Sequence, residues 1–184
     1  MIASIRKFKR GDLNKLLAMY SEFVPKGECQ GLPPLTESQT DQWLRRVEEI
    51  GSAQFVIEVG RNLVGHAMLC PGPHPKEAEL AVFLLQEFRG FGLGKALTLG
   101  ALHHGCQELQ LNRIWLSLRG SNPRALRLFE DIGFHPAKEW DPFTWEVEME
   151  RNSQCVQCRR DRCIVYSAKL PLLIEASREK RVSA

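Results

Sequence analysis

Apolar residues recur at helical spacing in four parts of the chain, and each part predicts one α-helix. The predicted helices cover residues 12–24, 36–50, about 93–110 and 122–132. In the first, Asp12 is a candidate N-cap and Val24 is the last member of the apolar stripe. The second begins with a capping box, in which Thr36 at the N-cap is followed three residues later by Gln39.

The other apolar segments are short or alternate with polar residues, as β-strands do. Predicted strands cover residues 54–59, 63–70, 79–85, 113–118 and 143–150, with a further strand near the N-terminus. Three strands follow one another without a helix between them, which favours a mixed α/β (α+β) fold over a doubly wound one. We expect a mostly antiparallel central sheet of six to seven strands, flanked by about four helices.

After Glu150 the pattern changes. Residues 151–184 are first polar and cysteine-rich, and then apolar with an interruption at Pro171. We therefore predict a domain over residues 1–150 and a basic, cysteine-containing appendage over 151–184, which docks on the body as a short helix or strand. The appendage has a net charge of +5, which leaves −2 for residues 1–150. A modest basic tail is usually solvated, so nucleic-acid binding is the least favoured function.

The composition is that of an ordinary globular protein. No apolar run approaches the roughly 18 residues that a membrane helix needs, and the N-terminal segment does not resemble a signal peptide. Six cysteines are spread along a chain long enough to bury a core without disulfides. We therefore expect a cytoplasmic protein with reduced cysteines and no membrane partner.

The segment with the most specific chemistry runs from a predicted strand through a glycine cluster into a helix. Exposed N–H groups at the start of a helix bind anions, and glycines at 90, 92 and 94 let the backbone approach an anion closely. A diphosphate is the expected ligand. Two common motifs do not match: Ala96 stands where a P-loop needs Ser or Thr, and Lys95 stands where the dinucleotide fingerprint needs its third glycine.

The segment Arg89-Gly90-Phe91-Gly92-Leu93-Gly94 resembles the (Gln/Arg)-x-x-Gly-x-(Gly/Ala) signature of the GNAT superfamily of acyl-CoA-dependent N-acyltransferases. The resemblance continues in NPRA (122–125) and LFEDIGF (128–134), and it covers about residues 4–150. It implies a GNAT-like fold. It also implies an enzyme that transfers an acetyl group from acetyl-CoA to a primary amine, by direct attack in a ternary complex.

The resemblance further implies where acetyl-CoA binds. The pantetheine arm would lie beside strand 79–85 where it separates from the next strand, and a β-bulge there would aim a free N–H at the thioester oxygen. Backbone groups of Val82, Phe83 and Leu84 would face this arm. The diphosphate would lie on the backbone amides of Arg89, Gly90, Phe91, Gly92, Leu93 and Gly94. Asn122 matches a position that contacts pantetheine, and Phe129 is expected both in the core and in the wall of the acyl-CoA tunnel.

The resemblance also suggests a catalytic residue. Glu79 stands where several members of the family carry a general-base glutamate, although a solvated carboxylate is the alternative interpretation. A lysine-like acceptor with a pKa of about 10.4 costs about 4.6 kcal/mol to become neutral at pH 7, so a base is expected to matter. The tyrosine that often protonates the leaving thiolate is replaced by Phe129. The proton would then come from water, Ser121 or His135.

That replacement keeps a second hypothesis open, a non-catalytic acyl-CoA-binding sensor of the same fold. The acceptor is a small molecule, a peptide or a protein, and a homodimer is left open. Candidates for the acceptor site are Trp43, the 25–35 loop and Trp140–Trp145. His66 is expected to be a satisfied polar group in its strand, and His103 and His104 are expected on the solvent face of their helix. No metal site is expected, because the cluster Cys155, Cys158 and Cys163 lacks a fourth ligand.

Overall fold

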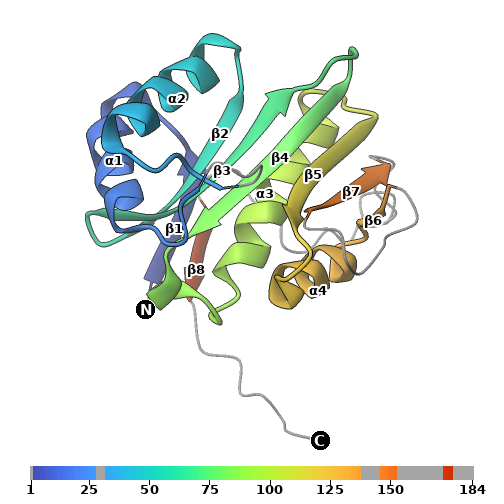
Figure 1. The fold of residues 1–184 in the computed structure, drawn as a ribbon. Helices are drawn as coiled ribbons and strands as arrows, with labels where there is room; N and C mark the ends of the chain where they lie inside the picture. The colour runs from blue at the N-terminus through green and yellow to red at the C-terminus, as the bar shows by residue number, and fades with distance from the viewer. Residues whose placement is uncertain (1, 28–31, 138–145, 153–171, 176–184) are drawn as a thin grey trace, which may run out of the picture.

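A computed structural model describes residues 2–27, 32–137, 146–152 and 172–175 of the chain. Strands and helices follow one another in the predicted order (Figure 1). The strands are β1 (Ile2–Lys7), β2 (Ala53–Val59), β3 (Asn62–Pro71), β4 (Glu77–Leu84), β5 (Arg113–Arg119), β6 (His135–Pro136), β7 (Glu146–Asn152) and β8 (Leu172–Glu175). The helices are α1 (Leu13–Glu22), α2 (Glu37–Glu49), α3 (Leu93–Gln107) and α4 (Pro123–Asp131), with 3-10 turns η1 (Arg10–Asp12) and η2 (Gln86–Phe88).

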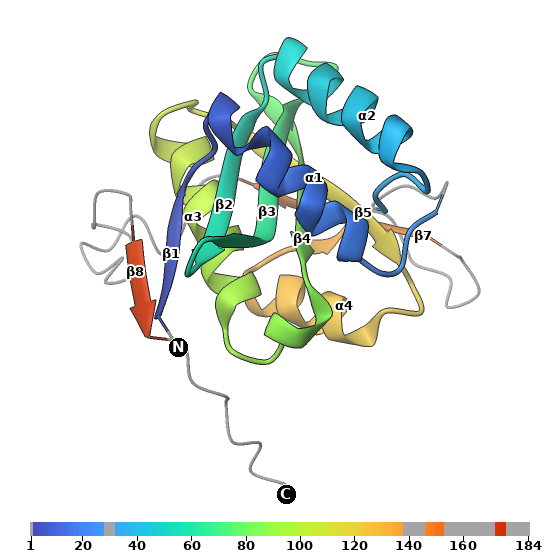
Figure 2. The same ribbon diagram turned by 90° about the vertical axis from the view of Figure 1, so that its left-hand side faces the viewer.

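The strands form one sheet in the order β6-β7-β5-β4-β3-β2-β1-β8. Only β4 and β5 are parallel, and the other neighbouring pairs are antiparallel. The mixed, mostly antiparallel fold with four α-helices is therefore confirmed. The described strands number one more than the expected upper limit, because β8 from the C-terminal appendage pairs with β1 at the edge of the sheet (Figure 2).

Helices cover both faces of this sheet (Figures 1 and 2). Phe83 of β4 packs edge-on against Tyr20 of α1 and Trp43 of α2, with ring centroids 5.5 and 5.8 Å apart. Its neighbour Leu84 lies beside the start of α3, where a Cβ added to Gly94 would be 3.7 Å from the Leu84 side chain. Because side chains alternate along a strand, odd-numbered residues of β4 face α1 and α2, and even-numbered residues face α3.

Two predicted helix starts have different outcomes. The capping box of α2 forms, since the Thr36 hydroxyl accepts a hydrogen bond from the Gln39 N–H at 3.2 Å. Asp12 occupies the N-cap position of α1, as predicted, but its side chain makes no capping hydrogen bond to the helix backbone. Its carboxylate accepts hydrogen bonds from the Arg6 guanidinium at 2.6 Å and from the Lys9 N–H at 2.9 Å. A charged donor from the neighbouring strand outcompetes the backbone of the helix for this acceptor.

Some predicted boundaries also differ. Helix α1 stops at Glu22, so Val24 is 55% exposed and does not continue the apolar stripe. Helix α3 ends at Gln107, earlier than the predicted 110. The predicted strand 143–150 is described from Glu146 onward. Residues 28–31, Trp140, Trp145 and the cysteines at 155, 158 and 163 lie outside the described residues.

Three buried polar side chains form a hydrogen-bonded chain under α1. The Tyr20 hydroxyl lies 2.8 Å from His66 Nδ1, and His66 Nε2 lies 3.0 Å from Gln54 Oε1. An amide oxygen only accepts, so His66 donates through Nε2 and its Nδ1 accepts from Tyr20. This confirms that His66 is a satisfied polar group. Complete burial favours its neutral form and lowers its pKa from 6.5 to about 3.

We expect His66 to make the folded state sensitive to acid. The unfolded chain protonates this histidine near pH 6.5, whereas the folded state resists protonation until about pH 3. The unfolded state therefore binds more protons between these values, and the free energy of unfolding falls as the pH falls through this window. The contribution reaches about 1.4 kcal/mol per pH unit. Urea unfolding at several pH values should give a shallower pH dependence for His66→Gln than for the wild type, and equal slopes would contradict the assignment.

Candidate active site

The sheet opens between β4 and β5. These parallel strands pair at only three register positions, of which the last is Glu79 with Trp115. In contrast, β4 stays paired with β3 as far as Leu84. The edge of β4 that faces β5 is therefore unpaired with β5 over the residues after Glu79. This is the separation of strands that the sequence led us to expect.

A group of ion pairs lies at the end of the opening where β4 and β5 are still paired. Arg113 of β5 donates from Nε to the Glu150 carboxylate of β7 at 2.6 Å. On its other side, the Arg113 guanidinium lies 3.6 Å from the Glu77 carboxylate of β4, too long for a hydrogen bond but close enough for attraction. One guanidinium thus connects three neighbouring strands at the point from which β4 and β5 diverge.

The direction of the β4 backbone decides which groups face the opening. The Leu85 N–H donates to the Val64 carbonyl of β3 at 2.9 Å, so the backbone N–H of Leu85 points toward β3. Backbone groups alternate along an antiparallel strand, so the N–H and C=O of Leu84 and Val82 point to the open side and those of Phe83 point to β3. The expected β-bulge is absent, because the β3–β4 register is continuous.

The glycine turn follows at the end of β4. Gly90 and Gly92 have φ values of 85° and 76°, in the left-handed region that favours glycine. The Arg89 N–H donates to the carbonyl of Gln86 and is engaged within η2. Along α3, the Ala96 N–H donates to the Gly92 carbonyl at 3.0 Å, whereas the first-turn amides of residues 93–95 have no acceptor within the helix. These amides form the part of the turn that is suited to an anion.

Two arginine side chains place positive charge beside this turn. Burial and the nearby guanidinium of Arg124 lower the pKa of Arg89. Arg124 lies in the first turn of α4 and is exposed. Two cations held close enough to repel one another favour an anion between or beside them. Sequence reasoning named Arg89 but missed Arg124, although it belongs to the NPRA segment that carried the family resemblance.

Asn122 and Phe129 have clear structural roles on α4. The Asn122 side chain caps the helix by accepting a hydrogen bond from the Ala125 N–H at 3.1 Å. Phe129 is 8% exposed and packs edge-on against Phe134, with ring centroids 5.6 Å apart. Phe129 is thus part of the core, as expected. Ser121 and His135, the named alternatives for a proton donor, are both exposed.

Glu79 lies on the opposite side of β4 from α3. It shares the odd-numbered face with Phe83, and its register partners are Cys70 on β3 and Trp115 on β5. Glu79 is partly buried, and its charge helps burial to raise the pKa of the Cys70 thiol. Sequence reasoning missed Trp115, although the alternation of RIWLSLR places it on the same face as Ser117.

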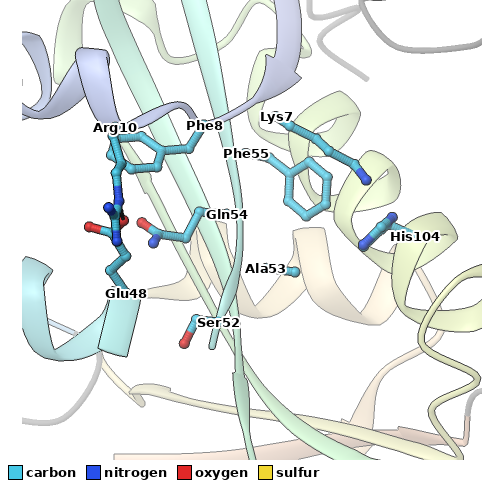
Figure 3. Close-up of a pocket in the computed structure, with 9 residues that line it drawn as sticks. All are labelled: Lys7, Phe8, Arg10, Glu48, Ser52, Ala53, Gln54, Phe55 and His104. Carbon is cyan, nitrogen blue, oxygen red and sulfur yellow. Dashed lines mark hydrogen bonds and ion pairs between the residues drawn. The ribbon is translucent and has the colours of Figure 1, made fainter. Parts of the chain in front are cut away.

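A separate pocket of about 300 Å³ lies away from the glycine turn, around the start of β2 (Figure 3). Arg10 and Glu48 form an ion pair on one side of β2, and Lys7 and His104 stand on the other. The His104 ring packs edge-on against the Phe55 ring, with centroids 5.3 Å apart, so the prediction that His104 faces solvent is wrong. This pocket contains none of the predicted site residues.

Metal ligands and membrane-spanning helices can be assessed for residues 2–27, 32–137, 146–152 and 172–175. In that part of the chain, no group of three or more His, Cys, Asp or Glu side chains is arranged to hold a metal ion. No helix there is long and apolar enough to cross a membrane.

A profile of the Acetyltransferase (GNAT) family matches residues 15–134, a range that contains most of α1, all of α4 and the whole β4–β5 opening with its glycine turn. The chain therefore belongs to the GNAT acetyltransferase family.

Two characterised relatives align with parts of the chain. Spermidine N(1)-acetyltransferase of Vibrio cholerae is 28% identical over 92 residues, which are 49% of this chain and 53% of that protein. Mycothiol acetyltransferase of Paenarthrobacter aurescens is 37% identical over 71 residues, which are 38% of this chain and 21% of that protein. The chain thus spans about half of the first relative and about a fifth of the second.

A solved structure shows the same fold over a larger part of the chain. Mutant forms of the spermidine/spermine N-acetyltransferase of Vibrio cholerae superpose with a TM-score of 0.65 at 21% identity. The superposition covers 85% of this chain and 97% of that chain. At this identity the likeness concerns the fold alone.

The glycine turn gives a matched pair of stability predictions. An added Cβ at Gly92 meets nothing within 4 Å, so Gly92→Ala should lose about 1–2 kcal/mol of unfolding free energy through its left-handed φ alone. Gly94 lies in α3 with ordinary contacts to Leu84 and Leu128. Gly94→Ala should therefore be neutral or stabilise by up to about 1 kcal/mol. Urea unfolding measures both variants, and a Gly92→Ala protein as stable as Gly94→Ala would refute the strain argument.

Proposed function

We propose that this protein is an N-acetyltransferase that transfers an acetyl group from acetyl-CoA to a primary amine. The observation that carries the proposal is the opening between β4 and β5, which leads directly into a glycine turn at the start of α3 with neighbouring cations. The names of both relatives, which are acetyltransferases, support an enzyme rather than an acyl-CoA sensor.

In the proposed complex, the pantetheine arm lies along the open edge of β4. The N–H and C=O groups of Val82 and the N–H of Leu84 pair with its amides, as a neighbouring strand would do. The diphosphate binds the turn from Gly90 to Gly94 and the amides at the start of α3, where the helix dipole favours negative charge. Arg89 and Arg124 supply positive charge beside it. Asn122 and Phe129 border the arm from α4.

The proposed chemistry begins with the acceptor as an ammonium ion. Glu79, directly or through water, takes a proton and leaves a neutral amine. The amine nitrogen bonds to the thioester carbon, whose oxygen becomes an oxyanion, and an N–H on the open edge of β4 stabilises this charge. The carbon–sulfur bond then breaks and CoA departs as a thiolate. The nitrogen, which is positively charged after the attack, gives its second proton to water and becomes the amide. Thiols ionise near pH 8.5, so CoA can leave as a thiolate without a tyrosine to protonate it. Water then protonates the thiolate.

The acceptor binds on the face of β4 that carries its odd-numbered side chains, between Glu79 and the aromatic residues under α1 and α2. We propose a primary amine on a small molecule, a peptide or a protein. Two relatives are named for spermidine and mycothiol, which favours testing small molecules first. We also propose a homodimer, which a measurement of the molecular mass in solution can test.

We also propose that residues 1–150 form the transferase domain and that residues 151–184 are an appendage to it. The pairing of β8 with β1 supports docking of this appendage on the sheet. The free thiol at Cys70 supports a cytoplasmic location, where cysteines stay reduced.

Donor binding provides the first test. Calorimetry should show saturable binding of CoA and acetyl-CoA to the wild type, and Arg124→Gln should weaken binding about three- to tenfold because a cation beside the diphosphate is lost. Arg127→Gln changes another exposed arginine of α4 and serves as the control. If the wild type bound neither CoA nor acetyl-CoA at millimolar concentration, the proposed function would be wrong.

Turnover provides the second test. Release of free CoA is followed with a thiol reagent across a panel of amines that includes spermidine. For the best acceptor, Glu79→Gln should lower kcat about 100-fold while the Kd for acetyl-CoA stays unchanged, because the base acts on the acceptor. Glu87→Gln, an exposed glutamate near the turn, should keep full activity. A Glu79→Gln protein with wild-type kcat would remove Glu79 from the mechanism.

A further inference from the structure

The Arg89 side chain bridges two segments that are far apart in the sequence. Its Nε donates to the Leu84 carbonyl at 3.0 Å, and its Nη2 donates to the Val24 carbonyl at 3.3 Å. The guanidinium carbon also lies 5.7 Å from the centre of the Phe23 ring, within the range of a cation–π contact. One side chain therefore joins the end of β4 to the residues that follow α1.

The two carbonyls belong to different halves of the proposed site. The Leu84 carbonyl points to the open edge of β4, where the donor is proposed to bind. Val24 begins the connection between α1 and α2, which borders the acceptor side. The described ends of this connection are joined by a hydrogen bond from the Gly27 N–H to the Pro33 carbonyl, at 3.2 Å. Arg89 contacts both halves directly.

The chemistry of the side chain suits this bridge. A guanidinium is a planar fork with several donors, so it can bond two carbonyls and stack on a ring at the same time. A lysine has a single ammonium group on a flexible stem and cannot keep this arrangement, although it keeps the charge. Arg89→Lys therefore removes the bridge between the two carbonyls but keeps the positive charge that attracts a diphosphate.

We propose that Arg89 is a positioning residue that couples the donor groove to the acceptor side of the active site. The inference rests on the proposed function. CoA bound at the glycine turn restrains Arg89, and Arg89 in turn restrains Val24 and the residues that follow it as far as Gly27. The acceptor side is thereby ordered when the donor is in place.

Hydrogen exchange with CoA as the probe tests this coupling without any acceptor. In the wild type, saturating CoA should slow exchange of the Gly27 amide by about tenfold, the effect expected from one charge-assisted hydrogen bond. Arg89→Lys keeps the positive charge beside the diphosphate, and at a CoA concentration that saturates this variant it should lose this slowing. Arg124→Lys, which changes the neighbouring cation in the same way, should keep it.

A steady-state measurement adds a second readout. With the amine selected from the panel, Arg89→Lys should raise the acceptor KM about tenfold and change kcat less than about threefold. The proposal is overturned if CoA binds the wild type without slowing the Gly27 amide, or if it slows this amide equally in Arg89→Lys. Failure of CoA to bind the wild type is a different result, which rejects the proposed function and this inference with it.

Discussion

The limited pairing of β4 with β5 is the constraint on which the site depends. Three register positions hold the strands together at one end, where Arg113 lies between carboxylates of β4 and β7. Beyond Glu79 the backbone groups on this edge of β4 need partners, because unpaired peptide groups are costly when they are shielded from water. A ligand that carries amides, such as pantetheine, can provide them. The same divergence brings the start of α3 and the start of α4 to the mouth of the opening.

A single strand can serve two substrates because its backbone and its side chains point in different directions. The backbone groups of Val82 and Leu84 point along the sheet toward the proposed donor. The side chains of Glu79 and Phe83 stand perpendicular to the sheet, on the face covered by α1 and α2. Donor and acceptor can therefore approach β4 from two sides and meet beside it. Arg89 contacts both sides, through Leu84 and Val24.

The buried polar groups beneath this face have a structural role. Tyr20, His66 and Gln54 satisfy one another in the core, and an aromatic group around Phe83 excludes water from them. Phe129 is similarly packed on the other side of the sheet against Phe134. In the proposed mechanism, the chemistry is left to the partly buried Glu79 and to backbone donors. A thiolate leaving group would make this proposed arrangement sufficient without a tyrosine on α4.

The sequence by itself determined the features that depend on a few neighbouring residues. These include the order of elements, the capping box at Thr36 and the turn that needs glycine at position 92. It did not determine that the carboxylate of Asp12, at the N-cap of α1, would bond Arg6, or that β8 would extend the sheet. It also could not show where β4 and β5 separate, or that Arg89 reaches a carbonyl 65 positions away. These features depend on contacts between distant segments, and only the folded chain brings their competing partners within bonding distance.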